Sequence, residues 1–112
     1  MKQPNTDYRI VMVSAPDIAV GKDLVSGAVQ RRLAACGKIF SQMQSYYWWE
    51  NKVTSSQEYQ LLFKTHENRL DELETWIISH HPYDTPELVV IPIESGFDKY
   101  LKWIGEETEA VV

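Results

Sequence analysis

The fold is decided by the stretch Tyr46-Tyr47-Trp48-Trp49-Glu50-Asn51-Lys52-Val53, followed shortly by Glu58-Tyr59-Gln60-Leu61-Leu62-Phe63-Lys64-Thr65. Aromatic and β-branched residues favour strands, and Glu50-Asn51-Lys52 between two apolar runs is typical of a turn. The two stretches therefore predict a long β-hairpin.

The aromatic side chains of this hairpin exceed what one small core can hide. Side chains alternate faces along a strand, so Tyr46 and Trp48 point one way while Tyr47 and Trp49 point the other. A two-layer domain covers only one face of its sheet with its own helices, and large exposed apolar patches mark interfaces. We expect a second chain to cover Tyr46, Trp48 and Leu62. The alternative is that two of the four aromatics are ordinary surface residues.

The segments before the hairpin predict a strand and a helix. Arg9–Ala15 is apolar and β-branched, which is typical of a buried central strand. Apolar residues then recur at helical spacing after Asp17, and we expect this helix to run through Ala35 and end at a left-handed Gly37. A strand follows from about Lys38 to Trp49, and its polar centre, residues 41–45, predicts a bulge or kink.

The segments after the hairpin predict a helix, a short strand and a final helix. The second helix opens at His66 and ends near His80-His81, the strand spans Glu87–Ile93, and the last amphipathic segment contains residues 100–104. The resulting order is that of a split βαβ, or ferredoxin-like, α+β fold with a four-stranded antiparallel sheet. We expect a flexible arm over residues 1–7 and one domain over residues 8–112.

Composition narrows the functional classes. The chain has 112 residues, 44% of them hydrophobic, and a net charge of −5, which argues against a nucleic-acid-binding protein. Cys36 is the single cysteine, so no intrachain disulfide can form, which favours a reducing compartment. No apolar run has the length of a membrane span, and the start of the chain lacks the apolar core of a signal peptide. We expect a cytoplasmic protein that does not engage membranes.

Several motifs in one order resemble a known family. They are Leu33-Ala34-Ala35-Cys36, the hairpin Tyr47–Lys52, Phe63-Lys64-Thr65, and above all His80-His81-Pro82-Tyr83-Asp84-Thr85-Pro86-Glu87. From residue 14 to residue 103 the chain resembles the divalent-cation tolerance protein CutA family. The resemblance implies a ferredoxin-like subunit in a homotrimer, whose long hairpins pair edge to edge as in the PII signalling proteins.

The resemblance also implies binding of divalent cations, copper foremost. Imidazole suits copper and zinc, and a carboxylate can complete such a site, so His80, His81 and Glu87 are the candidate metal ligands. Adjacent histidines on a helix point about 100° apart, which makes His80 with Glu87 the better pair. Family members linked to copper use a cysteine on the first strand, where this chain has Val13. The alternative is that both histidines cap the helix and form hydrogen bonds within the loop.

A second candidate site is a cleft between subunits. We expect it to be lined by hairpin aromatics and nearby charged residues, with Lys64 favouring a small anionic molecule; its residues are Tyr47, Trp49, Glu50, Glu58, Lys64 and Tyr83. The alternative is that Lys64 and Glu58 form a cross-strand or intersubunit ion pair.

No motif for a nucleophile, a phosphate loop or a zinc protease occurs, so we expect no enzyme. Three functions remain: a cation-binding trimer for metal tolerance, a PII-like trimeric sensor of a small anionic metabolite, and a trimeric scaffold for a protein partner.

Overall fold

The computed structural model describes residues 6–109. Residues 1–5 of the expected arm lie outside this range. Thr6 and Asp7 are hydrogen bonded to the body, Thr6 through its hydroxyl to the Ile93 carbonyl, and Asp7 through its carbonyl to the Glu67 N–H at 2.8 Å.

Four strands and three α-helices follow one another in the expected order. Their bounds are β1 Tyr8–Ala15, α1 Ile18–Gln30, β2 Cys36–Trp49, β3 Lys52–His66, a short 3₁₀ turn Glu67–Arg69, α2 Leu70–His80, β4 Leu88–Pro92 and α3 Asp98–Glu107. The strands form one antiparallel sheet in the order β2-β3-β1-β4. This is the predicted ferredoxin-like α+β fold.

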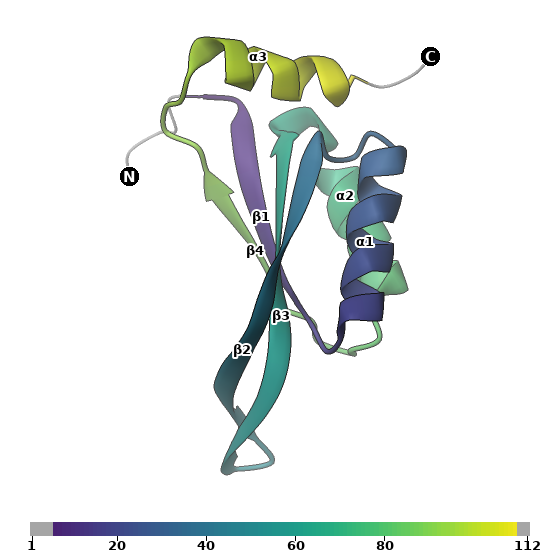
Figure 1. Ribbon diagram of the computed structural model, residues 1–112, viewed down its shortest axis with the longest axis vertical. Helices are drawn as coiled ribbons and strands as arrows, with labels where there is room; N and C mark the ends of the chain where they lie inside the picture. The colour runs from purple at the N-terminus through teal and green to yellow at the C-terminus, as the bar shows by residue number, and fades with distance from the viewer. Residues whose placement is uncertain (1–5, 110–112) are drawn as a thin grey trace.

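The sheet is covered unequally. Helices α1 and α2 lie side by side against one face, while α3 lies across the end of the sheet where β1 begins (Figure 1). The main core joins alternate residues of β1 and β3 to the inner sides of the two long helices; it includes Val11, Val13, Leu61, Phe63, Leu24, Leu73 and Ile77. A smaller cluster of Ala35, Leu101 and Ile104 attaches α3. Residues on the opposite face of the sheet are not covered by α1 and α2 (Figure 1).

Helix α1 is shorter than predicted. It ends at Gln30, and Arg32 takes the left-handed region with φ 57°. The Leu33 N–H donates to the Ala28 carbonyl and the Arg32 N–H to the Val29 carbonyl, both at 3.0 Å, which is the hydrogen-bond pattern of a Schellman cap. The expectation that the helix reaches Ala35 and ends at Gly37 is wrong, because this cap turns Leu33 back into the core. Gly37 instead lies in β2.

The hairpin is confirmed in its turn and its bulge. Glu50 and Asn51 have φ 50° and 63°, and Trp49 pairs with Lys52, so the turn has two residues and Lys52 belongs to β3. The register shifts between Phe40 and Met43, at the start of the polar segment where a bulge was expected.

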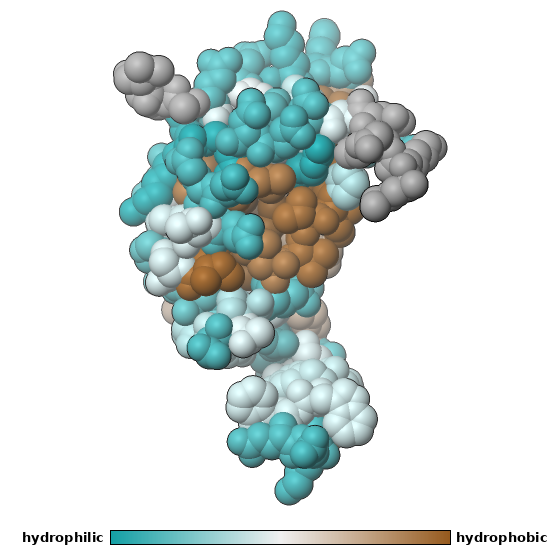
Figure 2. All heavy atoms as spheres, turned by 180° about the vertical axis from the view of Figure 1, so that it is seen from behind, coloured by the Kyte–Doolittle hydropathy of each residue, from teal (hydrophilic) through white to brown (hydrophobic). Residues whose placement is uncertain are grey.

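The hairpin projects beyond the rest of the sheet (Figure 1). Strand β3 pairs with β1 only from Tyr59 to His66, so residues 52–58 pair with β2 alone. Tyr46 is 73% exposed, Trp48 74% and Trp49 63%. Figure 2 shows this pale aromatic arm and a separate hydrophobic area on the body, on the side where β4 lies. Among residues 6–109, no helix has the length and apolar character needed to cross a membrane.

Candidate functional site

His80 is exposed at the C-terminal end of α2, and one of its ring nitrogens has no hydrogen-bond partner among residues 6–109. Its Nδ1 lies 2.8 Å from the Trp76 carbonyl oxygen, and its ring stacks on the Trp76 ring with centroids 4.5 Å apart. A carbonyl oxygen only accepts hydrogen bonds, so Nδ1 carries the proton of the neutral ring. Nε2 is then the nitrogen with a lone pair available for a metal ion.

His81 has a structural role, because both of its ring nitrogens are engaged. The residue is 8% exposed, and its Nε2 lies 2.7 Å from the Ser14 carbonyl oxygen. Its Nδ1 accepts a hydrogen bond from the Tyr83 N–H at 3.1 Å. His81 therefore fastens the loop after α2 to the end of β1. Its contact with Tyr83 lies within the loop, as in the alternative given above, whereas its contact with Ser14 was not expected.

Glu87 stands at the far end of the same loop, just before β4. It is exposed, and its Oε2 accepts a hydrogen bond from the Gln60 amide at 3.1 Å. Val13, at the position where copper-linked family members have cysteine, is fully buried in the core. Within residues 6–109, no three His, Cys, Asp or Glu side chains are grouped closely enough to hold a metal ion. Within residues 6–109, His80 and Glu87 are thus not joined by a third such side chain in a metal site.

The residues predicted to line a cleft fall into separate places. At the base of the hairpin, the Tyr83 hydroxyl donates to Glu58 Oε2 at 3.3 Å, and Glu58 is buried. Burial raises the pKa of Tyr83, and the negative charge of Glu58 and its hydrogen bond raise it further, with Tyr47 and Asp17 adding to the effect. The Tyr47 hydroxyl lies 3.1 Å from Ser56 Oγ. Trp49 and Glu50 are exposed at the tip.

Lys64 lies at the other end of the sheet, beneath α3. Its Nζ donates to the Tyr100 hydroxyl at 3.1 Å and lies 5.1 Å from the centre of that ring. Lys64 is six positions beyond Glu58 on β3, which corresponds to about 20 Å of extended strand. The two residues do not pair within one chain, so only the intersubunit form of that ion pair remains open.

Sequence reasoning missed the part that α3 plays around Lys64. Tyr100 also lies 3.7 Å from Cys36 Sγ, through its hydroxyl, and its ring stacks on Trp103. The signal was present in the amphipathic spacing of residues 100–104, but a helical pattern does not tell which part of the sheet the helix covers.

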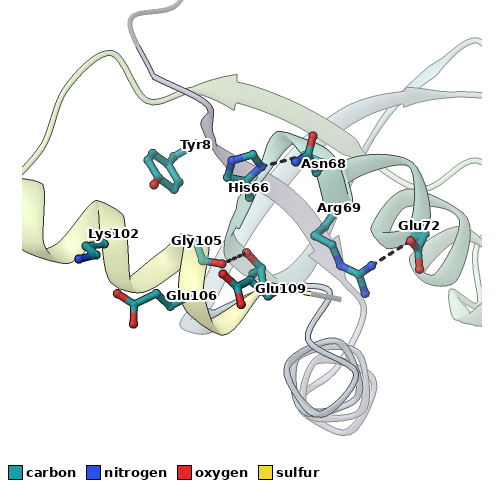
Figure 3. Close-up of a pocket in the computed structure, with 10 residues that line it drawn as sticks. Tyr8, His66, Asn68, Arg69, Glu72, Lys102, Gly105, Glu106 and Glu109 are labelled. Atoms are coloured by element: carbon teal, nitrogen blue, oxygen red, sulfur yellow. Dashed lines mark hydrogen bonds and ion pairs between the residues drawn. The ribbon is translucent and has the colours of Figure 1, made fainter. Parts of the chain in front are cut away.

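A polar hollow of about 760 Å³ was also missed (Figure 3). It lies between α3 and the 3₁₀ turn, and Figure 3 shows Tyr8 and His66 side by side on its wall. The Asn68 N–H donates to His66 Nδ1 at 3.1 Å, and Arg69 pairs with Glu72 at 2.9 Å. Its residues come from the two ends of the chain and the middle, so no local motif marks it.

Both the sequence and the fold are similar to those of known proteins. The family model described as CutA1 divalent ion tolerance protein matches residues 9–107. Protein CutA 1, chloroplastic, from Oryza sativa subsp. japonica is 39% identical over 99 residues, which are 88% of this chain and 56% of that protein. Divalent-cation tolerance protein CutA from Escherichia coli O45:K1 is 38% identical over 104 residues, which are 93% of each chain. The chain spans about half the length of the plant relatives, 56% and 54%.

Solved structures agree with the sequence comparison. CutA from Xylella fastidiosa superimposes with a TM-score of 0.91 at 32% identity, over 93% of this chain and 100% of the other. The divalent cation tolerance protein Cut A1 from Thermus thermophilus gives a TM-score of 0.89 at 34% identity, over 91% of this chain and 99% of the other. The likeness extends through nearly all of the described fold.

Proposed function

The chain belongs to the CutA1 divalent ion tolerance protein family, and from that premise we propose that it is a homotrimer that binds divalent cations, copper foremost, in the tolerance of metal ions. The family match over residues 9–107 carries the proposal. The projecting aromatic hairpin supports the assembly, because strand edges and aromatic surface of this size are normally covered. The expectation that the protein is not an enzyme and acts in the cytoplasm belongs to the same proposal.

His80 is the proposed metal ligand, with Glu87 as a second donor. Metal-binding histidines usually donate their other ring N–H to a carbonyl or carboxylate, which orients the ring. The contact of His80 Nδ1 with the Trp76 carbonyl meets that condition, and Nε2 of this exposed residue makes no hydrogen bond within residues 6–109. His81 lacks a free nitrogen and serves to hold the loop. Because Val13 supplies no thiolate, the site suits Cu(II) or another divalent ion better than Cu(I).

Calorimetric titration with Cu(II) tests this site. The comparison is between wild type, His80→Ala and the control His66→Ala, which removes another imidazole on the N-terminal side of α2. We expect His80→Ala to lose the tightest binding step and His66→Ala to retain it. Equal binding isotherms for all three proteins would remove His80 as the ligand.

A second candidate is a PII-like sensor of a small anionic metabolite, and the surroundings of Lys64 favour it. Its ammonium group is half-buried under Tyr100 and has no carboxylate partner among residues 6–109. A rise in melting temperature with an anionic metabolite, lost in Lys64→Ala and kept in Lys22→Ala, would support it. The scaffold reading would be supported instead by a specific protein partner that binds wild type but not a hairpin variant.

A further inference from the structure

Glu58 is a carboxylate that the fold buries without a positive charge beside it. It is 8% exposed, and its hydrogen bond within residues 6–109 comes from the neutral Tyr83 hydroxyl at 3.3 Å. The ion pairs in this part of the chain join Arg9 to Glu67, Arg32 to Glu107 and Arg69 to Glu72. A buried carboxylate is destabilising unless a cation or several strong donors compensate for lost water. Glu58 has neither within the described chain.

The neighbours of Glu58 do not supply the missing charge. Tyr83 is neutral at ordinary pH, and the groups whose negative charge raises its pKa include Glu58 and Asp17. Across the hairpin, Glu58 pairs with Met43. The described neighbours are therefore apolar, neutral or acidic, and a compensating cation has to come from outside residues 6–109.

The position of Glu58 makes it reachable by another chain. It is the last residue of the β3 segment that pairs with β2 alone, because pairing with β1 starts at Tyr59. It also lies opposite Met43, where the register of β2 shifts. The β1 side of residues 52–58 has no strand beside it in the described sheet.

We propose that Glu58 is half of an intersubunit ion pair whose other half is a lysine from the hairpin strands of a second copy of this chain. The proposal rests on the homotrimer proposed above. Strands β2 and β3 carry lysines with no carboxylate partner among residues 6–109, and these are Lys38, Lys52 and Lys64. A lysine fits better than a metal ion, because residues 6–109 hold no group of three His, Cys, Asp or Glu side chains close enough to form a metal site.

Sedimentation velocity over a dilution series tests the pair. Glu58→Gln keeps the shape of the side chain and removes its charge, so we expect the concentration at half-dissociation to rise at least tenfold. Lys38→Met, Lys52→Met and Lys64→Met are measured alone and combined with Glu58→Gln. One lysine variant should weaken association by a similar factor, with no further loss in the double variant. Glu74→Gln, an exposed glutamate on α2, should leave dissociation unchanged.

Exchanging the charges of Glu58 and its lysine partner keeps the proposal testable even if the single variant does not fold. If Glu58→Gln fails to fold, Glu58→Lys combined with the reverse change at the coupled lysine should restore a stable assembly. Unchanged dissociation in Glu58→Gln, or coupling to none of the three lysines, would overturn the inference while leaving the trimer intact. Dissociation of wild type by a metal chelator to the same extent would identify a metal counter-ion and overturn it as well. A wild type that is a single subunit at every concentration would instead remove the proposed assembly.

Discussion

At the scale of single residues, Gly27 and Trp76 show how closely α1 and α2 approach. A Cβ placed on Gly27 would lie 2.4 Å from Trp76 Cη2 and 2.6 Å from Cζ2. The same indole ring has the Arg31 guanidinium 5.0 Å from its centre and the His80 ring stacked on it. Gly27 is thus needed for a close approach between the two helices.

Gly27→Ala is expected to lower the free energy of unfolding. The added methyl group displaces an aromatic ring from a packed contact, which costs about 1–3 kcal/mol and outweighs the gain of about 1 kcal/mol in helix propensity. Urea denaturation measures the difference. Ser26→Ala, on the exposed side of the same turn, should change stability by less than about 0.5 kcal/mol. A more stable Gly27→Ala would contradict the close packing.

Tyr83 is expected to make stability fall at alkaline pH. Its pKa in the folded chain is raised above the ordinary value of 10.0 by burial and by Glu58. As pH rises past 10.0, the unfolded chain loses this proton while the folded chain keeps it, so the free energy of unfolding decreases until the folded pKa is passed. Below pH 10.0, the ordinary pKa, the contribution is fully present.

Denaturant midpoints at about pH 8 and about pH 11 check this dependence. Tyr83→Phe should show a smaller decrease between the two values than wild type. Tyr46→Phe removes a largely exposed phenol and should follow wild type. An identical decrease in Tyr83→Phe would mean that this phenol does not contribute.

At the scale of elements, the chain uses left-handed backbone at non-glycine residues in two tight connections. Arg32 ends α1 with φ 57°, and Glu50 and Asn51 form the hairpin turn with φ 50° and 63°. Two-residue hairpin turns of this hand favour Asn and Gly, so Glu50 is the unfavourable residue of the pair. The cross-strand pairs that flank it, Trp49 with Lys52 and Trp48 with Val53, hold the turn in register.

Glu50→Gly is expected to stabilise the hairpin slightly. It removes a left-handed penalty of about 1–2 kcal/mol and adds a backbone entropy cost of about 0.5–1 kcal/mol, so a net gain of about 0.5 kcal/mol is expected. Thermal unfolding measures it. Glu50→Ala removes the same carboxylate but keeps the penalty, and should show no gain. Equal changes in stability for the two substitutions would mean that loss of the carboxylate, and not relief of the left-handed backbone, causes the change.

At the scale of the whole molecule, one chain leaves the arm and the open edge of β2 uncovered. The arm carries the aromatics expected at an interface, and the body carries a separate hydrophobic area (Figure 2). Helices α1 and α2 cover one face of the sheet, and α3 lies over Lys64 at one end of the other face. These surfaces are what the proposed trimer would bury.

Trp48→Ser is expected to weaken self-association more than tenfold. Trp48 is 74% exposed in the single chain, and removing a buried interface aromatic commonly costs about 2 kcal/mol or more. Sedimentation equilibrium measures the change. Ile78→Ser is the control, since Ile78 is 44% exposed on α2, away from the arm and from the open face of the sheet. If both variants associate like wild type, the arm is not the interface.

The sequence by itself determined the order of elements, the antiparallel ferredoxin-like sheet, the hairpin turn and the bulge. These follow from local signals: alternation along strands, helical spacing, turn residues and the change from apolar to polar in β2. The predicted end of α1 was wrong. The helical spacing of apolar residues continues through Leu33, whereas the cap at Arg32 depends on how Leu33 packs in the core.

Only the tertiary structure decided which site residues meet. Lys64 and Glu58 share a strand, yet one contacts Tyr100 of α3 and the other Tyr83 of the loop after α2. Adjacent His80 and His81 likewise separate into an exposed ring and a buried one. The physical reason is that the groups that bury a side chain or form its hydrogen bonds belong to elements distant in sequence. Neither the spacing nor the type of the residues indicates which of those elements packs beside a given side chain.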